Sequence, residues 1–63
     1  MTEQQWDLIE RQAHAYVDPR LSGRDAEAAV RGIIAWEWVH PDAAPTRREL
    51  AWSGIVARAG VSY

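Results

Sequence analysis

Hydrophobic side chains recur along the chain at the spacing of α-helices, in three segments separated by two proline-containing breaks. At about 100° per residue, each segment gathers most of its apolar residues on one stripe and most of its charged residues on the remaining face. The stripes comprise Trp6, Ile9, Ala13, Tyr16 and Val17, then Ala26, Ala29, Val30, Ile33 and Trp36, then Ala51, Trp52, Ile55, Val56 and Ala59. The pattern predicts an all-α protein, a small three-helix bundle with helices at about 3–17, 23–39 and 47–59.

Local signals define the ends of the first two helices. Thr2 is followed three residues later by Gln5, which is the spacing of a capping box. The residue before a proline avoids helical geometry, so Pro19 should end the first helix and Pro41 the second. The Ser22 hydroxyl is the candidate cap for the start of the second helix.

The signals are less decisive at the end of the second helix and in the third helix. Residues 33–39 are β-branched and aromatic and could form a strand, but a lone strand would leave its edges unpaired, so we favour a helix. Thr46 and Glu49 repeat the capping-box spacing and predict a start at residue 47. Gly54 lies within this helix at a cost of about 1 kcal/mol, and Gly60 is placed to adopt the left-handed conformation beyond its end.

The composition limits the class of protein. A chain of 63 residues allows one domain, which we expect to span residues 1–63. The absence of cysteine excludes disulfides, thiolate zinc sites and a cysteine nucleophile. No segment has the roughly 20 apolar residues of a membrane span, and the N-terminus does not resemble a secretory signal. We therefore expect a cytoplasmic protein without membrane contact.

The choice of amino acids indicates the kind of genome that encodes the chain and does not identify its function. All seven basic residues are arginine, and alanine is abundant, which is typical of a GC-rich coding sequence. An actinobacterium, or a phage that infects one, is the source we infer. The net charge of −2 is unevenly spread: residues 1–19 carry four acids and one arginine, whereas residues 43–63 carry three arginines and one acid.

Two tryptophans in the second helix point in different directions. Trp36 belongs to the apolar stripe, and Trp38, two residues later, diverges from it by about 200°. Either Trp38 is exposed and anchors a partner, or the middle helix packs on two neighbours and buries both indoles. Glu37 falls inside the apolar stripe, and a buried carboxylate is costly unless it is paired, so it should either contact an arginine or lie at the frayed end of the helix.

Apolar residues outside the stripes indicate more hydrophobic surface than one small core consumes. Leu8, Leu50 and Ala57 join Trp38 in this group. Tryptophan and arginine are enriched at binding hot spots. We therefore predict a non-enzymatic protein-binding module, a phage or actinobacterial accessory factor that occludes or scaffolds a partner protein or self-associates. The predicted contacts are Trp38, Arg31, Leu8 and Trp52.

The last third of the chain suggests an alternative. Residues 46–51 (Thr-Arg-Arg-Glu-Leu-Ala) and 56–63 (Val-Ala-Arg-Ala-Gly-Val-Ser-Tyr) resemble the first helix and turn of LacI-type repressors, which implies a DNA-binding helix-turn-helix. That family usually has a small residue where this chain has Val56, and its recognition helix would begin at about Tyr63. A helix ending at a glycine explains the same residues, so we assign no family. The alternative function is nucleic-acid binding through Arg47, Arg48 and Arg58.

The sequence contains few features that would indicate an enzyme or a metal site. Glu10, His14 and Asp18 project from one helix face at a spacing that could ligate a metal, but we favour an ordinary solvated face with ion pairing. None of the serines lies in a nucleophile elbow, and no glycine-rich phosphate loop is present. We predict no catalytic residues, no metal, no cofactor and no small-molecule substrate.

Overall fold

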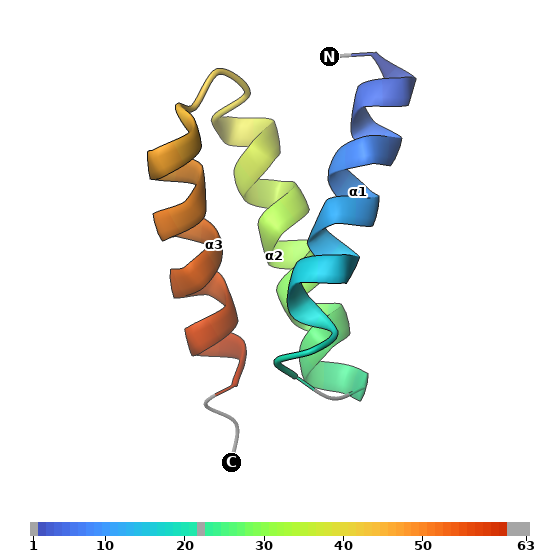
Figure 1. Ribbon diagram of the computed structural model, residues 1–63, viewed down its shortest axis with the longest axis vertical. Helices are drawn as coiled ribbons and strands as arrows, with labels where there is room; N and C mark the ends of the chain where they lie inside the picture. The colour runs from blue at the N-terminus through green and yellow to red at the C-terminus, as the bar shows by residue number, and fades with distance from the viewer. Residues whose placement is uncertain (1, 22, 61–63) are drawn as a thin grey trace.

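Three α-helices make up the fold in the computed structural model, which describes residues 2–21 and 23–60 (Figure 1). They are α1 (Glu3–Val17), α2 (Gly23–Val39) and α3 (Pro45–Ala59). These described ranges contain no strand, so the all-α prediction is confirmed and residues 33–39 are helical. None of the three helices combines the length and the apolar character that a membrane span requires.

The ends of α1 and α2 follow the predicted local signals. Thr2 Oγ1 accepts a hydrogen bond from the Gln5 backbone N–H at 3.2 Å, and Gln5 Oε1 accepts one from the Thr2 backbone N–H at 2.7 Å, which completes the capping box. Both helices stop shortly before a proline, at Val17 and Val39. The predicted Ser22 cap lies outside the described residues.

The start and the end of α3 differ from the prediction. The helix begins at Pro45, two residues early, with Ala44 as an N-cap that makes no side-chain hydrogen bond, so the Thr46 capping box is wrong. Proline suits the first helical position because its φ is already helical and it has no N–H to leave unpaired. Gly60 has φ −76° and is right-handed, so the left-handed prediction is also wrong. Its small size instead accommodates Leu21, whose Cδ2 lies 3.2 Å from where a Cβ of residue 60 would stand.

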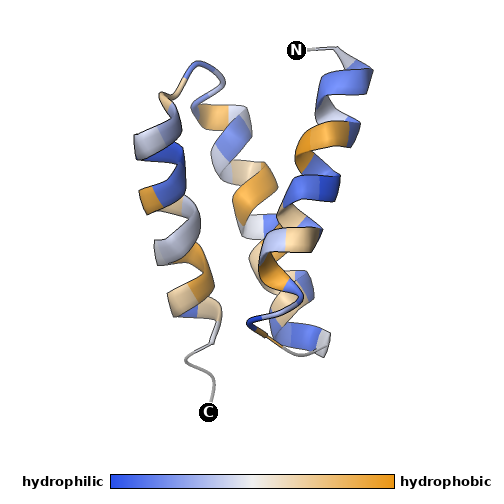
Figure 2. Cartoon of the chain, viewed as in Figure 1, coloured by the Kyte–Doolittle hydropathy of each residue, from blue (hydrophilic) through white to orange (hydrophobic). Residues whose placement is uncertain are grey.

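The core lies along α2, between α1 and α3. Figure 2 shows both hydrophobic and hydrophilic residues on every helix, so none is hydrophobic all round. The predicted stripes supply the buried side chains, namely Ile9, Ala13, Val17, Ala26, Ala29, Val30, Ile33, Trp52 and Val56. Trp6, Tyr16, Trp36 and Ile55 pack against this core while remaining partly exposed.

The helices α1 and α3 each pack along α2, whereas their described residues contact one another only slightly. They approach at one end, where the Tyr16 hydroxyl and Ser53 Oγ form a 2.8 Å hydrogen bond. Towards the start of α1 and the α2–α3 turn they diverge, as Figure 1 shows. The bundle is therefore closed at one end and open at the other.

Candidate functional site

An exposed pair of stacked indoles lies where the start of α1 meets the end of α2. Trp38 is 65% exposed, and its ring stacks on that of Trp6 with centroids 4.5 Å apart and planes 21° from parallel. Trp6 in turn packs against the core. Of the two alternatives for α2, the structure has the exposed one: Trp36 packs on the core and Trp38 faces outward.

A groove with a volume of about 520 Å³ runs between α1 and α2 beside Trp38. We call it the aromatic groove, and its residues are Glu10, His14, Glu27, Val30, Arg31, Ile34, Ala35 and Trp38. The apolar members all come from α2, where Val30, Ile34 and Trp38 follow one another at four-residue intervals on one side of the helix. Polar and charged residues from both helices form the remainder, so the groove is apolar with a polar rim.

The charges on this rim are mostly negative. Arg31 Nη2 lies 2.7 Å from Glu27 Oε1, an i,i+4 ion pair that neutralises the charge of the arginine. Glu10 and the neighbouring Asp7 form no ion pair within the described part of the chain. Glu10 therefore gives the α1 side of the aromatic groove a negative charge that is not held in an ion pair.

Glu37 is fully buried and ties α2 to α3. Its Oε2 accepts hydrogen bonds from Arg48 Nε at 2.8 Å and from the Trp52 indole N–H at 3.2 Å. The prediction that this carboxylate contacts an arginine is confirmed. The other oxygen, Oε1, has no hydrogen-bond partner among the described residues.

Trp52, another of the predicted partner contacts, is buried in the structure. The residue is only 8% exposed, and its ring meets that of Tyr16 edge-on with centroids 5.6 Å apart. The apolar stripe of α3 packs on α2, and the indole N–H is used by Glu37, so Trp52 has little surface to offer to a partner.

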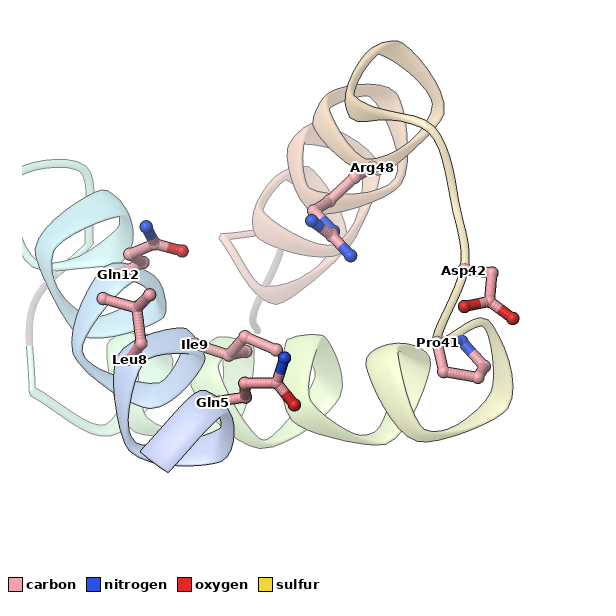
Figure 3. Close-up of a pocket in the computed structure, with 7 residues that line it drawn as sticks. All are labelled: Gln5, Leu8, Ile9, Gln12, Pro41, Asp42 and Arg48. Carbon is pink, nitrogen blue, oxygen red and sulfur yellow. The ribbon is translucent and has the colours of Figure 1, made fainter. Parts of the chain in front are cut away.

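Leu8, another predicted contact, is exposed but lies in a different groove. Figure 3 shows this second groove, with side chains of α1 on one side, Arg48 of α3 on the other, and residues of the α2–α3 turn at its end. Its volume is about 500 Å³, and its residues are Gln5, Leu8, Ile9, Gln12, Pro41, Asp42 and Arg48. The four predicted contacts thus do not form one site: Trp38 and Arg31 share the aromatic groove, whereas Leu8 does not belong to it.

The residues of the nucleic-acid alternative all lie on α3 but differ in exposure. Arg47 and Arg58 are exposed on α3. Arg48 is 34% exposed, and its Nε is engaged with Glu37. Only two of the three arginines are therefore displayed freely on the surface.

The possible metal ligands of α1 do not converge. Glu10 lines the aromatic groove and Asp18 lines a second hollow, and only His14 contributes to both. Across residues 2–21 and 23–60, no group of three or more histidine and acidic side chains is arranged to hold a metal ion.

Sequence reasoning placed Trp6 in the core stripe and missed its contact with Trp38. A usable signal was present: Trp6 and Trp38 each lie sixteen residues from position 22. Residues equally distant from a short turn become neighbours when two helices pack antiparallel.

These features define a small all-α protein with an exposed aromatic groove and a buried carboxylate under its third helix. In comparisons with known proteins, no family model, no curated protein and no solved structure matches this chain. Its function is therefore inferred from its own residues.

Proposed function

We propose that this chain is a non-enzymatic protein-binding module that uses the aromatic groove, with Trp38 as the anchor. It would act in the cytoplasm by occluding or scaffolding a partner protein or by self-association. The observation that carries this proposal is the stacked pair of Trp6 and Trp38, in which Trp38 is 65% exposed. The arginine-rich and alanine-rich composition supports a phage or actinobacterial source.

An exposed indole offers a binding partner a large apolar surface. Covering a tryptophan removes up to about 200 Å² of largely apolar surface from water, which is a large gain for one side chain. Trp38 is held from one side by Trp6, so it loses little conformational freedom on binding. An apolar centre with a charged rim is also the usual composition of a protein interface.

The experiment compares capture of proteins from the source cell by the tagged wild type and by the variant Trp38→Ala. We expect the variant to lose a partner that the wild type retains. The matched control is Leu8→Ala, which shortens a 50% exposed side chain in the second groove and should retain that partner. Circular dichroism checks that both variants keep their helices. Capture that survives in Trp38→Ala would reject the aromatic groove as the binding site.

The exposure of Arg47 and Arg58 favours nucleic-acid binding as a second candidate function. Neutralising phosphates with arginine releases counterions, so such binding must weaken steeply as salt increases. Binding to duplex DNA at low salt that is reduced by Arg47→Ala and Arg58→Ala would support this candidate. The absence of binding to duplex DNA at low salt would exclude this candidate function.

A further inference from the structure

A second exposed surface, which we call the basic strip, lies on α3. It consists of Arg47, Leu50, Ala57 and Arg58, all exposed, with Leu50 at 70%. At about 100° per residue these four positions fall within an arc of roughly 100° on the helix. Arg48 and Glu49 lie outside this arc, so the basic strip carries two positive charges beside an exposed leucine and no negative charge.

The aromatic groove is complementary to the basic strip, because it combines apolar surface with negative charge. Ile34 and Trp38 provide apolar surface, and Glu10 provides negative charge. Asp7 lies beside Glu10 in an adjoining hollow outside the groove, and neither acid has an ion-pair partner among the described residues. Arg11 lies beside these two acids on α1 but forms no ion pair with them. Complementary potentials of this kind select a partner and its orientation.

We propose that the aromatic groove of one copy binds the basic strip of a second copy. This inference rests on the proposed function, because it names the occupant of the same groove. Leu50 of the second copy would pack against Trp38 and Ile34, with Arg47 or Arg58 directed at Glu10 and Asp7. An arginine is also a good partner for the face of an exposed indole.

The two surfaces belong to different helices and are both exposed within one copy, so they do not cover each other. Their contact therefore joins copies head to tail, and each added copy presents a free groove and a free strip. Because one helix face makes a small interface, association should be weak and depend on protein concentration. Because charges lie on both sides, it should weaken as salt increases.

The test is sedimentation velocity of the wild-type chain at low and high salt, together with two single variants. We expect the wild type to associate at low salt and to dissociate at high salt. Trp38→Ala removes the anchor of the groove, and Arg47→Glu reverses one charge of the strip. Each change should weaken self-association about tenfold or more. Leu8→Ala, outside both surfaces, should behave as the wild type.

Mixing the two variants gives the sharpest readout. Trp38→Ala keeps an intact basic strip and Arg47→Glu keeps an intact groove, so an equal mixture should form a one-to-one dimer that cannot extend. Formation of this dimer also shows that both variants are folded. A wild type that stays monomeric at low salt would overturn the inference, as would association insensitive to salt or variants that fail to complement each other. The proposed function is judged separately, by whether Trp38→Ala loses a captured partner.

Discussion

At the scale of single residues, the ionic contact between Glu37 and Arg48 is the least tolerant feature of the protein. The carboxylate is fully buried in an otherwise apolar stripe, and one of its oxygens receives both of its hydrogen bonds. Removing one partner of a buried ion pair leaves an uncompensated charge, whereas replacing both partners with apolar residues is often neutral. The stability of the packing between α2 and α3 thus depends on one arginine, Arg48.

Replacing that arginine should destabilise the fold. Loss of a partner from a buried pair costs about 3–5 kcal/mol, and since Arg48 is 34% exposed, we expect Arg48→Met to lower the free energy of unfolding by about 2 kcal/mol. Urea denaturation followed by circular dichroism measures this change.

The control is the double variant Glu37→Leu with Arg48→Met. It removes the buried charge together with its partner and should recover most of the lost stability, apart from about 1 kcal/mol for the indole N–H of Trp52, which is left unpaired. A double variant no more stable than Arg48→Met would show that the buried charge is not the cause of the loss.

At the scale of helices, the packing of α2 on α3 depends on a glycine that the sequence pattern does not single out. A Cβ at Gly32 would stand 2.9 Å from Ile55 Cγ2, closer than two carbons can lie. This methyl group is attached directly to the Cβ of Ile55 and cannot swing aside freely. Gly32 therefore permits the close approach of the two helices.

We expect Gly32→Ala to destabilise the protein despite the better helix propensity of alanine. The substitution gains about 1 kcal/mol of propensity but forces an overpacked contact that costs about 1–3 kcal/mol. The expected net loss is about 1 kcal/mol in the free energy of unfolding, measured by urea denaturation.

Gly54→Ala is the matched control within α3. There the nearest atom to a new Cβ is the mobile Nη1 of Arg58 at 3.6 Å, an ordinary contact distance. With no clash to offset the propensity, this variant should gain about 1 kcal/mol. Equal effects of the two substitutions would contradict the role given to Ile55.

The elements differ in how much of them could be predicted from sequence. Helix periodicity and the Thr2 capping box are local, and they gave the bounds of α1 and α2. The start of α3 was missed because Pro45 and Thr46 both suit a helix start, and the choice between them depends on how the preceding turn is built. Gly32 and the Trp6–Trp38 stack depend on contacts between helices, which a pattern along one helix does not contain. The pairing of Glu37 could be predicted in kind, because a buried charge needs a partner, but its partner Arg48 could not be named.

At the scale of the whole molecule, α2 is the central helix, and α1 and α3 both pack on it. It buries side chains towards both α1 and α3, whereas α1 and α3 meet mainly near Tyr16 and Ser53. The first half of α1 thus lies at the open end and is supported from one side only. Segments with few packed neighbours open locally at a lower free energy than the fold as a whole.

This difference predicts uneven hydrogen exchange. Backbone amides of residues 7–10 in α1 should exchange at least about tenfold faster than those of residues 30–34 in α2, which corresponds to about 1.4 kcal/mol of opening free energy. Exchange followed by NMR at each amide measures the ratio. Trp38→Ala removes the stack on Trp6 and should raise exchange in this part of α1 while leaving α3 unchanged. Equal protection in all three helices would instead mean that the chain opens only as one cooperative unit, with the free end of α1 held as firmly as the middle of α2.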